Sequence, residues 1–239
     1  MKYILSVLLI VNIAFSFDDT SFLKRDTVYS QNKKYCGIIS GMYNEGYSGA
    51  SYTLYDLENQ DTVWSQFVEG DQLFPCVSNI GDMTISAGSE LKIYDTDEHL
   101  KGVNTGDQIY SYGGPTVQAF SLSGDRLCFF AKNNYDSMDD VTLICVTNSA
   151  VELWRDSIGL YRPTNLIFYK DKYILHYSNF HSSPPYRCFI LDMEGAVVWQ
   201  YDRKTKGEWD VQFDDKSGLL IIVDGLMSKK IDINTIAAP

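Results

Sequence analysis

Short apolar runs separated by turns fill most of the chain, and the clearest pair is RCFILDMEGAVVWQY at residues 187–201. Its two strand-like halves flank a turn at residues 192–195, where Gly195 permits the positive φ of a tight turn. The pattern recurs as TLYDLENQDTVWSQF from residue 53 and LICVTNSAVELWRDS from residue 143. LKIYDTDEHLKGV from residue 91 lacks the tryptophan, and SKKIDIN from residue 228 gives only the first half. The pattern predicts repeated β-hairpins.

The repeats follow one another at regular intervals. Their anchor residues Asp56, Asp95, Thr147, Asp192 and Asp232 are 39, 52, 45 and 40 residues apart. A tryptophan follows the anchor by eight residues in the first repeat and by seven in the third and fourth. A period of about 40–45 residues with four short strands per unit is typical of a β-propeller blade.

Each of the first four repeats accommodates four strands, and no long segment after residue 16 has a helical period. In the fourth repeat the strands are predicted at residues 165–169, 173–178, 187–192 and 196–201. The others are predicted at 27–30, 35–40, 52–56 and 62–67; at 74–78, 83–87, 91–95 and 100–103; at 117–121, 126–131, 141–147 and 151–154; and at 211–213, 218–223 and 229–232. The predicted fold is therefore all-β, a propeller of five four-stranded blades.

One register has an alternative. DTVYSQ at residues 26–31 nearly repeats DTVWSQ at 61–66 and would suit an outer strand of the fifth blade. YSQNKKYCGII also parallels FYKDKYILHY of the fourth repeat, which favours an inner strand of the first blade. The fifth blade then needs a closing strand from residues 17–23 or 233–236, because an open blade leaves unpaired edge groups.

The hairpin FILDMEGAVVWQY resembles the repeat of quinoprotein-like (PQQ-like) and WD-repeat β-propellers. Shared features are a strand ending in Leu-Asp, a glycine turn and a following strand with tryptophan. The resemblance implies a propeller fold. The quinoprotein dehydrogenases that it resembles bind a quinone with calcium, but no residue here matches that site, so no cofactor is expected. Trp64, Trp154 and Trp199 occupy matching positions and are expected to pack between neighbouring blades.

Residues 1–16, MKYILSVLLIVNIAFS, have the pattern of a secretory signal peptide cleaved before Phe17. A buried strand or a membrane anchor is the alternative, but the run is too short to span a bilayer of about 30 Å as a helix. Residues 17–239 are then expected to form a single β-propeller domain, secreted or periplasmic, with no membrane span.

The net charge of −11 argues against nucleic acid, whose phosphates would be repelled, and against anionic membrane surfaces. The five cysteines lie in apolar runs, without a CxxC motif or a His/Cys cluster, so no metal site is predicted. Buried free thiols are favoured, with a Cys128–Cys145 pair as the alternative.

The predicted connections differ in length between the two ends of the blades. The A–B and C–D turns share one face and are short. The connections at residues 41–51, 104–115, 132–140 and 179–186 share the other face, called here the long-loop face, and are long. Binding residues concentrate on loops of rigid scaffolds, so this face is the predicted binding surface.

Aromatic and polar side chains gather on the long-loop face, and tyrosine suits the binding of peptides or sugars. The candidate ligand-binding residues are Tyr43, Glu45, Tyr47, Tyr110, Tyr112, Asn134, Tyr135, Asp136, Phe180, His181 and Tyr186. The alternative is that these rings pack their own loops.

Catalytic signals are few. No GxSxG motif is present, His176 falls within a strand, and the oxygen-rich residues 133–140 lack the calcium-loop spacing. We therefore expect a secreted non-enzymatic module that binds a protein or glycan. The alternatives are a scaffold subunit of an exported complex and a glycoside hydrolase of the five-bladed propeller type. The hydrolase would use carboxylates among Glu45, Asp71, Asp107, Asp136 and Glu208.

Overall fold

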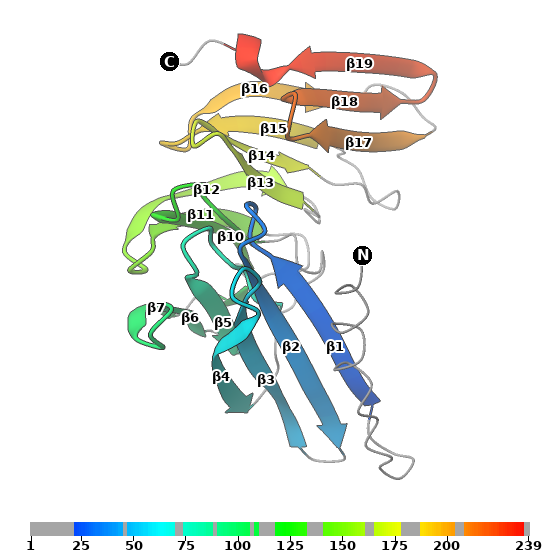
Figure 1. Ribbon diagram of the computed structural model, residues 1–239. Helices are drawn as coiled ribbons and strands as arrows, with labels where there is room; N and C mark the ends of the chain where they lie inside the picture. The colour runs from blue at the N-terminus through cyan, green and yellow to red at the C-terminus, as the bar shows by residue number, and fades with distance from the viewer. Residues whose placement is uncertain are drawn as a thin grey trace.

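The computed structural model describes residues 22–44, 47–69, 74–87, 90–105, 108–109, 118–132, 141–160, 165–177, 187–203 and 208–236. These residues form antiparallel β-sheets, with one short 3-10 helix, η3 (Ile233–Thr235), after the final strand. Figure 1 shows the sheets side by side, from the blue N-terminal strands to the red C-terminal ones. Within the described residues, no helix is long and apolar enough to cross a membrane.

Successive stretches of the chain make successive sheets. The first sheet contains β1 (Phe22–Tyr29), β2 (Tyr35–Asn44), β3 (Tyr47–Asp56) and β4 (Asp61–Glu69). The second contains β5 (Met83–Ala87), β6 (Glu90–Tyr94) and β7 (Leu100–Thr105). The third contains β8 (Gln108–Ile109), β9 (Gln118–Phe120), β10 (Arg126–Lys132), β11 (Val141–Thr147) and β12 (Glu152–Leu160). The fourth contains β13 (Asn165–Tyr169), β14 (Tyr173–Tyr177), β15 (Arg187–Asp192) and β16 (Val197–Asp202). The fifth contains β17 (Trp209–Asp214), β18 (Leu219–Asp224) and β19 (Met227–Asp232).

Each sheet packs against the next through its buried side chains. On β10, Leu127 and Phe129 belong to the cluster shared with the second sheet, whereas Phe130 belongs to the cluster shared with the fourth. A strand buried on both faces reads as a continuous apolar run, which explains the sequences of β10 and β11. Strand β17 instead alternates, with Trp209 and Val211 buried against the fourth sheet and Gln212 exposed.

The tryptophans occupy one register position, directly after a bulge between the last two strands of a sheet. Leu54 pairs with Trp64, Cys145 with Trp154 and Ile190 with Trp199. The indole N–H of Trp64 donates to the carbonyl of Asp95 in the second sheet at 2.8 Å, and Trp199 packs into the cluster between the fourth and fifth sheets. The prediction that these rings pack between neighbouring blades is confirmed.

Side-chain hydrogen bonds join four short turns of the first four sheets, those that contain Asn32, Asn79, Leu122 and Asp171. Asn79 of the second sheet accepts from the backbone N–H of Asn32 at 2.8 Å and donates to the carbonyl of Leu122 at 2.9 Å. Asp171 of the fourth sheet accepts from the N–H groups of Leu122 and Ser123 at 2.6 and 3.1 Å. These bonds hold the four turns in a connected series.

The predicted loop at residues 41–51 is wrong. Strands β2 and β3 continue through it, and Asn44 pairs with Tyr47 across a two-residue connection. Strand pairing uses backbone groups, so it extends through small and polar residues that give no hydrophobic signal. The hairpin of β2 and β3 is visible as the longest pair of strands in Figure 1.

Two other predicted segments differ from the structure. The expected strand at residues 74–78 is reduced to one bridge, between Val77 and Met83. The N–H of Cys76 donates to the side-chain hydroxyl of Thr84 at 2.7 Å and so is not used in backbone pairing between strands. Within the expected connection at residues 104–115, Gln108–Ile109 forms β8 and pairs with β10.

The expected closing strand at residues 233–236 is also wrong. Residues Ile233–Thr235 form η3, whose start is capped by the Asp232 carboxylate accepting from the N–H of Asn234 at 2.9 Å. Of the other candidate, residues 17–23, Phe22 and Leu23 belong to β1 in the first sheet, and the rest lie outside the described residues. The inner-strand register of residues 27–30 is confirmed, since β1 pairs with β2.

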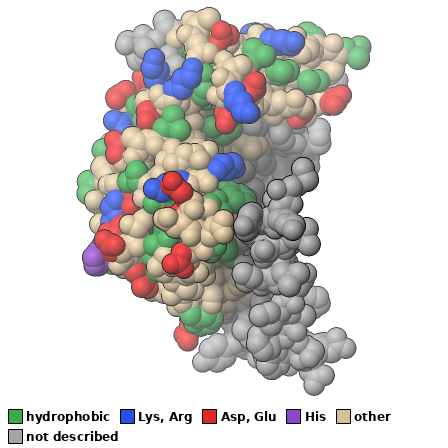
Figure 2. All heavy atoms as spheres, in the orientation of Figure 1, with side chains coloured by type: hydrophobic (Ala, Val, Ile, Leu, Met, Phe, Trp, Pro, Cys, Tyr) green, Lys and Arg blue, Asp and Glu red, His purple; other side chains and the backbone are tan. Residues whose placement is uncertain are grey.

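All five cysteines are buried free thiols, which is the favoured prediction. Cys128 and Cys145 lie directly opposite each other on β10 and β11, both fully buried. On the molecular face in Figure 2, acidic and basic side chains are interspersed with small apolar areas.

Candidate functional site

The predicted ligand-binding residues fall largely outside the described residues. Tyr43 lies on β2 and Tyr47 on β3, next to the tip of their hairpin. The others, which the structure does not describe, are Glu45, Tyr110, Tyr112, Asn134, Tyr135, Asp136, Phe180, His181 and Tyr186.

The same holds for most of the candidate catalytic groups. Of the carboxylates considered for glycoside hydrolysis, Glu208 is described and exposed, and Glu45, Asp71, Asp107 and Asp136 lie outside the described residues. The oxygen-rich segment 133–140 also lies outside them. His176 is within β14 as predicted, paired with Leu166 and Phe189.

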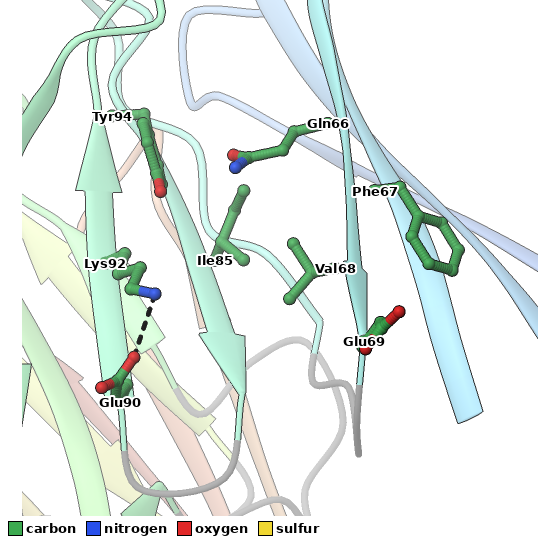
Figure 3. A pocket seen from close by; sticks show the side chains of 8 residues that line it. All are labelled: Gln66, Phe67, Val68, Glu69, Ile85, Glu90, Lys92 and Tyr94. Atoms are coloured by element: carbon green, nitrogen blue, oxygen red, sulfur yellow. Dashed lines mark ion pairs between the residues drawn. The ribbon is translucent and has the colours of Figure 1, made fainter. Parts of the chain in front are cut away.

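A cavity of about 200 Å³ lies where the first sheet meets the second, and we call it the β4–β6 groove. Strand β4 contributes Gln66 and Val68, β5 contributes Ile85, and β6 contributes Lys92 and Tyr94. Figure 3 shows these five side chains pointing toward one another, whereas Phe67 points to the opposite side of β4. The remaining lining residues are Phe67, Glu69 and Glu90.

Strand alternation explains this arrangement, because every second residue of a strand faces the same side. Gln66 and Val68 share one face of β4, and Lys92 and Tyr94 share one face of β6. Ile85 is 2% exposed and belongs to the buried cluster between the two sheets. The groove therefore has an apolar floor on a rigid core, with polar side chains along its walls.

Gln66 carries the most unusual atom of the groove. Its side-chain Oε1 is buried without a hydrogen-bond partner among the described residues. A buried acceptor without a partner destabilises a fold by about 1–3 kcal/mol. Because a leucine would fill similar space without this penalty, the amide stands out as a group that an external donor would satisfy.

The other walls are aromatic and charged. The Tyr94 ring lies 5.9 Å from the Trp64 ring, centroid to centroid, at an interplanar angle of 56°. Lys92 Nζ lies 3.0 Å from Glu90 Oε2. The hydrogen bond from Lys92 to Glu90 raises the pKa of Lys92, so the ammonium stays charged and paired.

A second polar cluster joins the fourth sheet to the fifth. The Tyr201 hydroxyl donates to the buried Asp224 carboxylate at 3.0 Å, and burial together with this bond raises the pKa of Tyr201. Tyr201 stacks on Trp209 at 6.3 Å, and Lys229 Nζ lies 5.3 Å above the Tyr201 ring. These contacts are directed into the interface, so the cluster holds the two sheets together.

Asp95, Asp97 and His99 bring three potential metal ligands within 4.8 Å of one another in the turn between β6 and β7. The Asp95 carboxylate already accepts from the N–H groups of Asp97 and His99, both at 2.9 Å. Burial of Asp95 is outweighed by these N–H groups and by the nearby His99 and Lys101, so its pKa is lowered. The cluster thus stabilises its own turn.

Sequence reasoning missed the β4–β6 groove, since Gln66 and Tyr94 belong to different repeats. It also missed the cluster of Asp95, Asp97 and His99, although the D-x-D-x-H spacing is visible in the sequence.

Comparison with known proteins shows the fold alone. No family model and no curated protein matches the sequence. The β-propeller domain of the trilobed protease from Pyrococcus furiosus, which has an open velcro topology, is similar with a TM-score of 0.55 at 12% identity, over 92% of this chain and 73% of that one. The Dos1 propeller gives a TM-score of 0.57 at 12% identity, over 93% and 60% of the two chains. The C-terminal WD40 domain of Sif2 gives 0.52 at 10% identity, over 87% and 58%.

The chain has a β-propeller-type fold built from repeated antiparallel sheets. It spans about three fifths of the length of the Dos1 and Sif2 chains that it matches.

Proposed function

We propose that this chain is a secreted, non-enzymatic binding module that holds a segment of a protein partner along its long-loop face and in the β4–β6 groove. The observation that carries the proposal is the groove itself, a pocket between two rigid sheets with a buried acceptor, Gln66 Oε1, that the described protein groups leave unpaired. Preorganised pockets of this kind supply anchor points at protein interfaces.

The position of the groove connects it to the long-loop face. Glu69 ends β4 and Glu90 begins β6, so both lie at the end of their sheets where the long connections emerge. Gly49 on β3 pairs with Glu69, and the same hairpin continues from there to Tyr47 and Tyr43. A segment leaving the groove at Glu69 would therefore meet the hairpin tip.

The scaffold in this proposal is a five-bladed propeller closed by a terminal strand. The connected inner turns at Asn79 and Asp171 support the convergence of the first four sheets on one axis. We also propose that the repeated hairpin is related to the repeat of quinoprotein-like propellers.

Affinity capture tests this function. The chain from residue 17 is immobilised and exposed to proteins secreted by the source organism, beside a Tyr43→Ala/Tyr47→Ala variant. Tyr29→Ala is the control, since Tyr29 is 49% exposed at the opposite end of the first sheet. We expect the double variant to lose a partner that the wild type and the control retain. Equal recovery by all three proteins would refute the use of this face.

A glycan partner is examined in the same experiment by exposing the three proteins to an array of oligosaccharides. If glycan binding is lost in the Tyr43→Ala/Tyr47→Ala variant while protein capture is unchanged, the partner is a carbohydrate and not a protein.

A further inference from the structure

We propose that the β4–β6 groove binds the side chain of an arginine that belongs to an extended segment of the partner protein. The inference rests on the proposed function and specifies the chemistry of its anchor. It is carried by the acceptor, the aromatic ring, the charges and the size of the groove.

The acceptor requires a donor. Gln66 Oε1 is buried and has no partner among the described residues, while the amide points across the groove toward β6 (Figure 3). A guanidinium presents five N–H donors in a planar fork, and no acceptor, so it matches a lone carbonyl oxygen. A carboxylate would place a second acceptor against the first and is disfavoured.

The aromatic wall favours a planar cation. Tyr94 lines the groove beside Gln66, and its ring centroid lies 5.9 Å from that of Trp64 at an interplanar angle of 56°. Guanidinium is weakly hydrated and stacks on aromatic faces, whereas the compact ammonium of lysine is strongly hydrated. The methylene stem of the arginine would lie on Val68 and Ile85.

The charges of the groove admit a cation. Among the lining residues that the structure describes, Lys92 is the one basic group, and its ammonium is paired with Glu90 at 3.0 Å. Among the described lining residues, Glu69 is a second acidic group, at the end of β4 and on the strand face that carries Phe67. The net charge of −11 over the whole chain acts in the same direction by steering basic segments toward it.

The size of the cavity selects one side chain. Pockets for drug-sized ligands and cofactors occupy roughly 300–1,000 Å³, and the groove offers about 200 Å³. That volume accepts a single long side chain entering from the surface.

The first experiment uses three small probes: N-acetyl-arginine methylamide, the lysine analogue and the neutral citrulline analogue. Binding is followed by the Trp64 indole N–H signal in NMR, assigned with Trp64→Phe, because Trp64 contacts Tyr94 at the edge of the groove. We expect the arginine probe to shift this signal with a dissociation constant on the order of 1 mM. We expect the other two probes to bind at least about tenfold more weakly than the arginine probe. Equal binding of the lysine or citrulline probe would overturn the assignment of a guanidinium.

The second experiment removes the acceptor. Gln66→Leu keeps the shape of the side chain, and we expect about tenfold to a hundredfold weaker binding of the arginine probe. The unfolding midpoint should stay unchanged or rise, because an unpaired buried acceptor disappears. Gln66→Glu should strengthen the binding of the arginine probe and should not strengthen the binding of the citrulline probe. Ser65→Ala is the control, an exposed residue on the opposite face of β4 and outside the groove lining, and it should bind as the wild type does.

Unchanged probe binding by Gln66→Leu, or a loss of stability in that variant, would show that the amide is a structural group and would overturn the inference. The outcome is separable from that of the proposed function. If the probes fail while capture still depends on Tyr43 and Tyr47, the anchor is wrong and the binding module stands. If the arginine probe binds while partner capture does not depend on Tyr43 and Tyr47, the proposed use of the long-loop face is wrong.

Discussion

Trp154 donates its indole N–H to the backbone carbonyl of Met193 at 2.9 Å, across the boundary between the third and fourth sheets. Trp64 makes the equivalent bond to Asp95 across the boundary between the first and second sheets. In both cases the acceptor lies in the hairpin turn of the next sheet. The repeat in the sequence is therefore also a repeat of contacts, in which Trp64 and Trp154 each join their own sheet to the following one.

The two tryptophans should differ in how much stability their N–H groups contribute. The carbonyl of Met193 also accepts from Arg126 Nη1 at 2.7 Å, so it keeps a partner in Trp154→Phe. In Trp64→Phe the carbonyl of Asp95 loses its indole donor and keeps the N–H of Glu98, at the longer distance of 3.3 Å. We expect Trp64→Phe to lower the free energy of unfolding by about 0.5–1.5 kcal/mol and Trp154→Phe to lower it less. Urea denaturation measures both, and a larger loss for Trp154→Phe would contradict the assignment.

Gly102 occupies the tryptophan position in the second sheet, opposite Ile93. A Cβ there would lie 2.2 Å from the carbonyl oxygen of Ser149, which is backbone and cannot rotate away. We expect Gly102→Ala to destabilise the protein by about 1–3 kcal/mol through overpacking. Gly41→Ala is the matched control, since the nearest atom would be 3.9 Å away. Thermal unfolding of the two variants tests this prediction, and equal unfolding midpoints would contradict the steric explanation.

Asp82 and Asp125 follow the turn glycines of the second and third sheets, yet their pKa values move in opposite directions. Burial raises the pKa of Asp82, and Lys101 Nζ at 2.7 Å only partly offsets this. The hydroxyls of Ser123 and Ser121, at 2.6 and 2.8 Å, outweigh burial and lower the pKa of Asp125.

The two carboxylates should therefore give opposite pH dependence. Ionised Asp125 stabilises the fold above its ordinary pKa of about 3.9, and this contribution is lost as the pH falls through the lowered value. For Asp82 the ionised form is disfavoured by folding, so stability declines as the pH rises from about 3.9 through the raised value. The stability of wild type relative to Asp125→Asn should thus increase with pH, and that relative to Asp82→Asn should decrease. Denaturation between about pH 3 and 7 tests the signs, and parallel slopes would contradict them.

The buried thiols should be unreactive in the folded protein. Burial raises the pKa of Cys76 to about 12 and also raises that of Cys188, and the reactive species is the thiolate. We expect Ellman's reagent to label none of the five cysteines in the native protein and all five in urea. Rapid labelling of one thiol in native buffer would reveal local opening of its strand.

Hydrophobic alternation and turn residues, read along the sequence, predicted most strands because they are local signals. The run ILD before the turn at Gly195 and the tryptophan after it mark the hairpin of residues 187–201. Strands β10 and β11 were recognisable because both of their faces are buried, which makes them continuously apolar. The buried free cysteines followed from the same pattern.

Only the tertiary structure decided where the sheets meet and what that meeting creates. Gln66 and Tyr94 are placed across one groove by the packing of two sheets, and nothing in either repeat marks the pair. The paired backbone between residues 41 and 51 likewise has no apolar pattern, because its strands are held by backbone hydrogen bonds that any side chain permits. Local periodicity encodes the strands, whereas the position of a site depends on contacts between residues that are distant in the chain.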